Sequence, residues 1–251
     1  MSEDTPPRIA IPMPHAADRE YSERAIPQYE RAVQLAGGEP VRIPLDCSAA
    51  DVMNLIERCD AVLLPGSKAD VDPAQFKAER SPHTAPADPL RDAVDYLLLE
   101  DAYVLHKPVL GICYGLQSLN VYRAGSLVQH IPDFLPQEAR GKVNHEAGKN
   151  VKVAHGVTVE PGSRLASIIV AAKTQRVVPV NSSHHQSADA IGEGLRVVAR
   201  CAEDGIVEAL EGTAPDHFVL AVQWHPERSV EDDEPSRAIF RAFIEAAEKR
   251  R

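Results

Sequence analysis

Short apolar segments alternate with helical patterns in the first half of the chain. The apolar runs are typical of buried strands, and the stretches between them have the spacing of amphipathic helices. Strands separated by helices favour a parallel sheet covered on both faces. We therefore predict the α/β class, with a doubly wound, mostly parallel sheet. The predicted strands span 8–13, 41–45, 61–65 and 108–112, and the predicted helices span 21–36, 50–57 and 89–106.

The second half of the chain is richer in strand-like segments, which follow one another without long helices between them. Some of these segments are expected to form hairpins and antiparallel edge strands. A final amphipathic helix is predicted at 235–249, after acidic residues that suit a helix start. We expect one domain over residues 1–251, with 66–90 as a long surface loop. The strand-like segments are 150–160, 175–181, 195–200, 205–211 and 218–224.

Composition narrows the classes of function. The chain has 251 residues and a formal net charge of −10, which disfavours binding to phosphate backbones. Aromatic residues make up 5%, too few to favour a stacking platform for single-stranded nucleic acid. No apolar run is long enough to span a membrane, and the first residues lack the apolar region of a signal peptide. We expect a cytoplasmic protein that binds neither nucleic acid nor membrane.

The segment PVLGICYGLQSLN, residues 108–120, places Cys113 between a predicted strand and a helical pattern. Gly111 and Gly115 flank it, and without Cβ atoms they allow strand and helix to approach closely. This is the pattern of a nucleophile elbow, in which a helix start favours the thiolate and the N–H of Tyr114 can stabilise an oxyanion. Free cysteines are also common as buried packing groups. On this segment alone, both interpretations stay open.

The segment FVLAVQWHPE, residues 218–227, supplies partners for a nucleophile. A buried strand ends at His225, and Glu227 follows two residues later, so both side chains can point to the same side of an extended chain. Glu227 could then orient the imidazole while its other nitrogen faces the thiol, as in a triad. A histidine at a strand end is also commonly structural. With Cys113, however, two strand ends would converge on the edge where parallel sheets place their sites.

These segments together resemble the class I glutamine amidotransferase-like superfamily, whose triad is Cys, His and Glu. Within it, LLPGSKADVDP (63–73), LNVYRAGSLVQHIPD (119–133) and VNSSHHQ (180–186) are similar to segments of γ-glutamyl-γ-aminobutyrate hydrolases and related γ-glutamyl hydrolases. The resemblance covers nearly the whole chain. It implies a flavodoxin-like sheet with additional antiparallel strands, and a cysteine hydrolase that cleaves a γ-glutamyl amide.

The resemblance also implies roles for individual residues. Cys113 would be the nucleophile, His225 the general base and acid, and Glu227 the residue that orients it. The oxyanion would be held by the N–H groups of Gly66 and Tyr114. Ser67 stands where the family has a second glycine, and Tyr114 where these hydrolases often have arginine. The residues expected to contact the glutamyl group are Gln117, Ser183, His184 and His185.

A metal site is not predicted. His184 and His185 have no third ligand at a recognisable spacing, and the segment HEAGK at 145–149 is not H-E-x-x-H. The other cysteines form no C-x-x-C pair and are expected to be inert packing residues. The chemistry needs no metal and no cofactor. The cysteines concerned are Cys47, Cys59 and Cys201.

The leading expectation is therefore a hydrolase of a small γ-glutamyl substrate, with γ-glutamyl-γ-aminobutyrate as the first candidate. One alternative is a glutaminase subunit that delivers ammonia to a separate synthetase. Another is a catalytically inactive binding or regulatory module, which would be expected to lose a member of the triad. The sequence leaves a homodimer open.

Overall fold

The four predicted strands of the first half and one strand of the second half form the parallel part of a nine-stranded sheet among the described residues. The structure, a computed structural model, describes residues 5–170 and 177–251. The spatial order in this part is β2-β1-β3-β4-β11. The second strand begins two residues before its predicted start, because Glu39 pairs with Arg8. The parallel strands are β1 (Arg8–Pro12), β2 (Glu39–Ile43), β3 (Ala61–Leu64), β4 (Val109–Ile112) and β11 (Val219–Val222).

The other part of the sheet is antiparallel and continues from β11 in the order β10-β9-β6-β7. The segment 150–160 contributes a strand only in its second half. The segment 175–181 contributes β7, and its residues 175 and 176 lie outside the described residues. A separate two-stranded pair, β5 (Leu127–Val128) with β8 (Ser187–Ala188), was not predicted. The antiparallel strands are β6 (His155–Val159), β7 (Val177–Val180), β9 (Leu195–Cys201) and β10 (Val207–Gly212).

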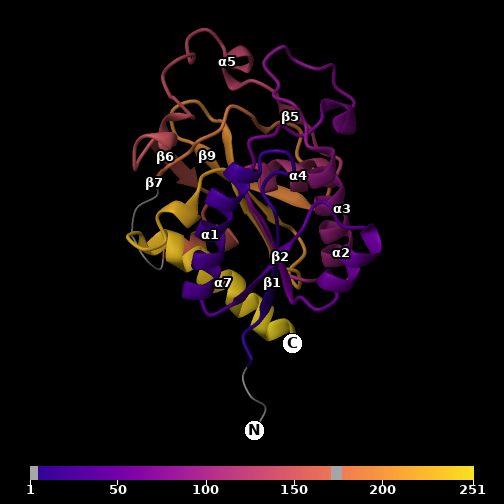
Figure 1. Cartoon of the computed structure of the whole chain (residues 1–251). Coiled ribbons are helices and arrows are strands. Elements are labelled where there is room, and N and C mark those ends of the chain that lie inside the picture. Colours follow the sequence, from indigo (N-terminus) through magenta and orange to yellow (C-terminus); the bar gives the residue numbers. More distant parts are fainter. Residues whose placement is uncertain (1–4, 171–176) are drawn as a thin grey trace.

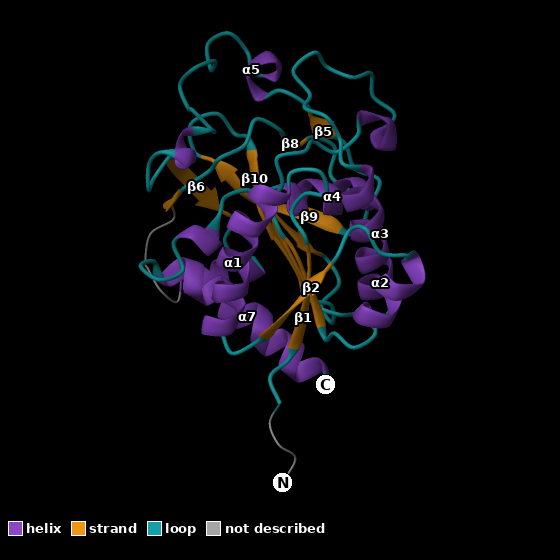
Figure 2. Cartoon of the chain, in the orientation of Figure 1, coloured by secondary structure: helices purple, strands orange, loops and turns teal. Residues whose placement is uncertain are grey.

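Helices cover both faces of the sheet, as Figures 1 and 2 show. One face packs on α1 (Arg19–Leu35), α6 (Arg164–Val170) and α7 (Glu234–Arg250), and the other on α2 (Ala49–Ile56), α3 (Pro89–Val104) and α4 (Tyr114–Tyr122). Each face has its own apolar core, and each fully buried aliphatic or Phe side chain in it stabilises the fold by roughly 1.5–3 kcal/mol. This three-layer arrangement confirms the predicted α/β class.

The long helices begin where the sequence offers an acidic cap. The side chains of Asp18, Asp88 and Asp233 accept the N–H of the third residue of α1, α3 and α7, respectively. Each contact satisfies a backbone N–H of the first turn that has no carbonyl partner within the helix. The negative charge of the aspartate is also stabilised by the positive end of the helix dipole. The shorter helices α5 (Ile131–Phe134) and α6 were not predicted.

The carboxyl ends of the parallel strands point toward one end of the molecule, where the loops around β5 and α5 lie (Figure 1). The loop 66–90 belongs to this end and contains one 3-10 turn, η1 (Pro73–Phe76). Among the described residues, no helix combines the length and apolar character needed to cross a bilayer.

Candidate active site

Cys113 lies alone between the end of β4 and the start of α4, as the sequence predicted. Its backbone has φ 53° and ψ −104°, a conformation that L residues rarely adopt and that costs on the order of 1–3 kcal/mol. Its N–H donates to the carbonyl of Val222 at 2.8 Å, which fixes the turn beside the end of β11. The residue is buried, with 7% of its surface exposed. Strained backbone of this kind is characteristic of residues held for a function.

The two flanking glycines are required by close contacts. A Cβ on Gly115 would lie 2.2 Å from the carbonyl oxygen of Leu64, and a Cβ on Gly111 would lie 2.8 Å from the carbonyl oxygen of Gly115. Any larger residue would therefore push α4 away from β3 and β4. The glycines allow the helix to start directly over the sheet, with Cys113 at its first turn.

His225 and Glu227 follow β11, the parallel neighbour of β4. Ile112 is in register with Val222, so Cys113 and the segment after β11 leave the sheet at the same edge. His225 Nδ1 lies 2.7 Å from Glu227 Oε1, and both side chains are buried. A Cβ built on Gly66 would lie 3.1 Å from His225 Cε1 and 3.6 Å from Cys113 Cβ. The imidazole of His225 and the side chain of Cys113 therefore both lie next to Gly66.

The charges around His225 favour its protonated form. Burial opposes the charged imidazole, but the carboxylate of Glu227 and the charge of Cys113, together with a hydrogen bond to Cys113, raise the pKa of His225 to about 9. Burial opposes the charged form of Glu227 as well, yet His225 holds the pKa of Glu227 below its usual range. The arrangement can hold an imidazolium next to Cys113, with the carboxylate fixing the ring.

The backbone of His225 is held by a residue that sequence analysis did not single out. The amide of Asn181 accepts the N–H of His225 at 2.9 Å and donates to the carbonyl of His225 at 2.9 Å. Both contacts are buried. Asn181 lies in the segment VNSSHHQ, so the motif was noticed while its first polar residue was not.

The N–H of Gly66 is already bonded, contrary to the expectation that it holds an oxyanion. It donates to the hydroxyl of Tyr29 at 3.0 Å, while the carbonyl of Pro65 in the same peptide accepts from buried Arg91 at 2.7 Å. This peptide is therefore fixed from both sides. The next N–H along the loop, that of Ser67, makes no hydrogen bond to any described residue, and neither does the N–H of Tyr114. Tyr29 and Arg91 were not predicted as site residues, because nothing in their own helices distinguishes them.

A cavity of about 380 Å³ opens beside Cys113 and His225. All four expected substrate-binding residues line it. Both ring nitrogens of His184 already have partners on other residues. Its Nδ1 lies 2.8 Å from the carbonyl oxygen of Gln186, and its Nε2 lies 3.3 Å from Glu208 Oε1. The full lining is Tyr21, Arg24, Ser67, Lys68, Ala69, Asp70, Cys113, Tyr114, Gln117, Glu146, Lys149, Ser183, His184, His185, Gln186, His225 and Arg228.

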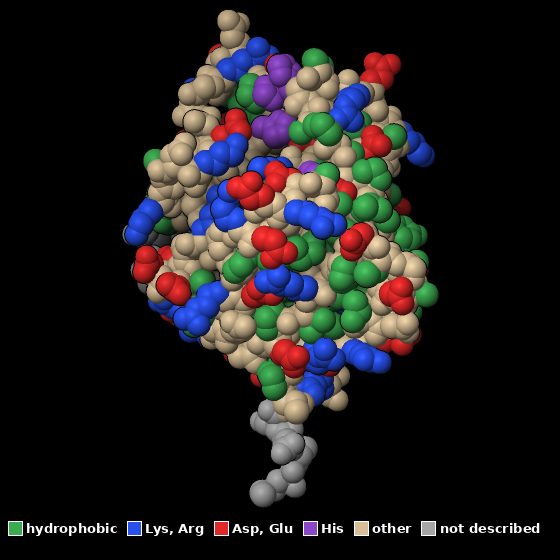
Figure 3. Space-filling view, in the orientation of Figure 1, with side chains coloured by type: hydrophobic (Ala, Val, Ile, Leu, Met, Phe, Trp, Pro, Cys, Tyr) green, Lys and Arg blue, Asp and Glu red, His purple; other side chains and the backbone are tan. Residues whose placement is uncertain are grey.

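Gln117 and His185 are fixed by contacts at the wall of this cavity. The Gln117 amide donates to the carbonyl of Gln186 and to Gln223 Oε1, both at 3.3 Å. His185 Nε2 lies 3.1 Å from Asp70 Oδ1, and this hydrogen bond raises the pKa of His185. Figure 3 shows histidine side chains gathered in the upper part of one face of the molecule.

The remaining cysteines differ in environment. Cys59 and Cys201 are buried, and burial raises the pKa of each thiol, so the prediction that they are packing residues is confirmed by their burial. Cys47 is exposed, so the prediction that it packs in the interior is wrong. None of these three lines the cavity beside Cys113.

Comparison with known proteins places these features in a family. The model described as Peptidase C26 matches residues 9–227. A relative from Mycobacterium tuberculosis named "Putative glutamine amidotransferase Rv2859c" is 39% identical over 220 residues, covering 87% of this chain; the chain spans 66% of that relative's length. The gamma-glutamyl-gamma-aminobutyrate hydrolase PuuD of Escherichia coli (strain K12) is 33% identical over 226 residues, covering 88% of this chain and 85% of the relative.

A solved structure confirms the fold. The glutaminase domain of Trypanosoma brucei CTPS with bound acivicin superposes with a TM-score of 0.65 and 19% identity, over 96% of this chain and 94% of that one. At this level of identity, the structural similarity is evidence for the fold alone. It agrees with the class I glutamine amidotransferase-like sheet that the sequence motifs predicted.

Proposed function

The chain belongs to the peptidase C26 family of class I glutamine amidotransferase-like proteins, and on that premise we propose that it hydrolyses a γ-glutamyl amide through a thioester on Cys113. The observation that carries the proposal is the strained turn of Cys113 beside the buried His225–Glu227 pair. A buried packing cysteine needs neither the strain nor the pair.

In the first half of the reaction, the Cys113 thiolate attacks the γ-carbonyl carbon. A C–S bond forms, and the carbonyl electron pair moves to the oxygen. When the tetrahedral intermediate collapses, the C–N bond breaks and His225 donates a proton to the leaving amine. The raised pKa of His225 suits this step, because the proton is present at neutral pH.

In the second half, water hydrolyses the γ-glutamyl thioester. Neutral His225 accepts a proton from the water, whose oxygen attacks the thioester carbon, and the C–S bond breaks. Glutamate leaves, and the thiolate is restored beside the imidazolium. Glu227 keeps the ring in the tautomer and orientation that both halves need.

The oxyanion is held by the N–H groups of Ser67 and Tyr114 in this proposal. Ser67 replaces Gly66 in that role because the Gly66 N–H is bonded to Tyr29. Ser67 and Tyr114 both line the cavity beside Cys113. Ser67→Pro removes the N–H, whereas Ser67→Ala keeps it. We expect the first variant to lose about 10²–10³-fold in kcat and the second to keep most of it; equal activity of the two variants would remove Ser67 from the oxyanion site.

The charges of the cavity favour a leaving group that carries a carboxylate. Its lining has more cationic than acidic side chains, in a chain with a net charge of −10. γ-Glutamyl-γ-aminobutyrate has two carboxylates and one ammonium group, whereas a γ-glutamyl polyamine has a further ammonium group. The electrostatic preference is therefore for the former. The cationic residues are Arg24, Lys68, Lys149 and Arg228, against Asp70 and Glu146.

A second candidate is a glutaminase that passes ammonia to a synthetase, because one relative bears a glutamine amidotransferase name. The two functions share the thioester and differ in the leaving group and in their need for a partner. A glutaminase subunit would release glutamate from glutamine slowly when alone. A hydrolase would turn over its own substrate without a partner.

The test is glutamate release by the purified chain from γ-glutamyl-γ-aminobutyrate, a γ-glutamyl polyamine and glutamine, with Cys113→Ala as the matched variant. We expect turnover of the first substrate to exceed that of the other two, and to disappear in the variant. Turnover of glutamine alone would favour the glutaminase. Equal turnover in wild type and variant would refute the proposed chemistry.

A further inference from the structure

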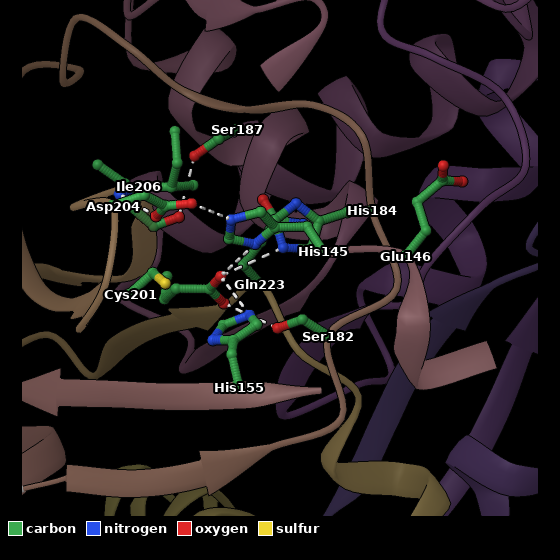
Figure 4. Close-up of polar contacts among 12 residues, drawn as sticks. His145, Glu146, His155, Ser182, His184, Ser187, Cys201, Asp204, Ile206 and Gln223 are labelled. Atoms are coloured by element: carbon green, nitrogen blue, oxygen red, sulfur yellow. Dashed lines mark hydrogen bonds and ion pairs between the residues drawn. The ribbon is translucent and has the colours of Figure 1, made fainter. Parts of the chain in front are cut away.

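A second cluster of buried side chains lies behind the wall of the cavity and takes no part in the proposed reaction. Three histidines and one glutamate each direct a ligand atom to a common point, and all four ligand atoms lie within 4.8 Å of one another. Figure 4 shows the rings of His145, His155 and His184 turned toward one another. The four residues are His145, His155, His184 and Glu208, and all are buried.

The distances from one carboxylate oxygen to the three nitrogens are close to the edge length of a metal tetrahedron. Glu208 Oε1 lies 3.2 Å from His145 Nδ1, 3.2 Å from His155 Nε2 and 3.3 Å from His184 Nε2. Ligands at the usual zinc distances of about 2.0–2.2 Å are separated by about 3.4 Å in a tetrahedron. Charge-assisted hydrogen bonds between nitrogen and carboxylate are shorter, about 2.7–2.9 Å.

Hydrogen bonding accounts for only one of the three inward nitrogens, His184 Nε2, which contacts Glu208 Oε1 at 3.3 Å. One carboxylate oxygen has too few lone pairs to accept from three imidazoles. His145 Nδ1 and His155 Nε2 have no hydrogen-bond partner among the described residues, although both are buried. Buried nitrogens without partners are costly, and a bound cation would satisfy both.

Contacts on the outer side of the cluster leave the inner atoms free to bind a metal. His145 Nε2 contacts Asp204 Oδ2 at 2.9 Å, and His184 Nδ1 lies 2.8 Å from the Gln186 carbonyl oxygen. Ser182 Oγ donates to Glu208 Oε2 at 3.0 Å, which leaves Oε1 for the centre. Metal-binding histidines typically donate their second N–H in this way, and the outer partner fixes the tautomer.

From this geometry we infer that His145, His155, His184 and Glu208 form a structural site for a divalent transition-metal cation, with zinc as the best match. Three imidazoles and one carboxylate suit zinc, and four protein ligands leave no open position for catalysis. The charge also balances, because a divalent cation compensates the two buried acids, Glu208 and Asp204.

The site would hold together the segments that form the cavity wall. The His184 N–H donates to the carbonyl of His145 at 3.0 Å, and the Gly148 N–H donates to the carbonyl of Ser182 at 2.9 Å. Cavity residues lie on both segments, among them Glu146, which points away from the cluster in Figure 4. A cation bound by both segments would fix this wall without touching the reacting atoms.

A proton is the competitor for the cation. Because histidine binds metal in its neutral form, zinc would displace this proton. The two states therefore differ in composition and can be told apart by elemental analysis.

The experiment is the metal content of the untagged full chain, purified from zinc-supplemented cells and dialysed against metal-free buffer. We expect about one zinc per chain. Glu208→Gln should reduce the zinc content at least about tenfold. Glu211→Gln, the same change at a buried glutamate of the same strand, should leave the content unchanged.

The Tm of the wild-type protein provides a second readout, which does not depend on whether the variants fold. Removing the metal with 1,10-phenanthroline should lower Tm, the non-chelating 1,7 isomer should not, and equimolar Zn²⁺ but not Mg²⁺ should restore it. Less than about a tenth of a zinc per chain, with no rise of Tm on adding Zn²⁺, would overturn the inference. Neither measurement involves glutamate release, so failure of the proposed hydrolase function would leave this result unaffected.

Discussion

Replacing Glu227 with Gln tests whether the carboxylate sustains the protonated imidazole. Gln preserves the size of the side chain that lies 2.7 Å from His225 Nδ1, but removes its charge. The pKa of His225 rises from its ordinary 6.5 to about 9, although burial opposes the rise, and Glu227 is the largest favourable cause. That difference corresponds to about 3 kcal/mol, or about 300-fold in rate if all of it is lost in the transition state.

The raised pKa of His225 predicts how stability and activity change with pH. Because the folded-state pKa of His225 is raised, its protonation stabilises the fold fully below about pH 6.5, and this contribution is lost as the pH rises through about 9. The activity that depends on the imidazolium should fall over the same upper range. In Glu227→Gln, the alkaline fall should move toward lower pH.

The assay is kcat/KM for glutamate release between pH 5 and about 10, which reports the free enzyme. Glu231→Gln is the matched control, because Glu231 is an exposed carboxylate paired with Arg31 at 3.3 Å. We expect the control to match wild type. A decrease of less than about threefold in Glu227→Gln, with an unchanged alkaline limb, would refute this role of the carboxylate.

Two further predictions concern the residues that position the site. Asn181→Ala leaves the buried N–H and carbonyl of His225 without partners, and we expect a loss of about 2–5 kcal/mol in the free energy of unfolding. Urea denaturation measures it, and a loss below about 0.5 kcal/mol would contradict the contacts. Gly115→Ala places a Cβ 2.2 Å from a β3 carbonyl oxygen, so we expect about 3 kcal/mol or more of destabilisation. Near-wild-type thermal stability of this variant would mean that α4 does not pack so closely on the sheet.

Much of the geometry of the candidate site was predictable because its signals are local. The turn of Cys113 follows from an apolar strand, two glycines and a helical pattern that lie within a few residues of one another. His225 and Glu227 were predictable for the same reason, since both follow directly from the end of a strand. These two residues come close to Cys113 because β4 and β11 are parallel neighbours in the sheet.

The contacts that position this centre could not be predicted, because they join segments far apart in sequence. The bond between Tyr29 and Gly66 crosses 37 positions, and Arg91 reaches Pro65 from the start of α3. Neither residue differs from ordinary helical residues in its own segment. The Gly66 N–H was therefore expected to hold the oxyanion, because its hydrogen bond to the hydroxyl of Tyr29 could not be predicted.

The histidine cluster was missed for a related reason. His184 and the segment HEAGK, which contains His145, were each considered and not predicted to bind metal, because the four ligands lie in four segments at spacings that match no metal motif. The antiparallel part of the sheet brings His155 and Glu208 to the same place, and the strand-like pattern of 150–160 gave no sign of it. Spacing along the chain identifies metal sites only when the ligands share a helix or a turn.

Acylation of Cys113 is the step on which the proposed hydrolysis depends. Its most direct test is mass spectrometry of the acid-quenched reaction with γ-glutamyl-γ-aminobutyrate, followed by digestion and mapping of the peptide that contains Cys113. We expect a γ-glutamyl group on this peptide in wild type, and none in Cys113→Ala. A γ-glutamyl group on another cysteine, or full turnover by Cys113→Ala, would contradict it.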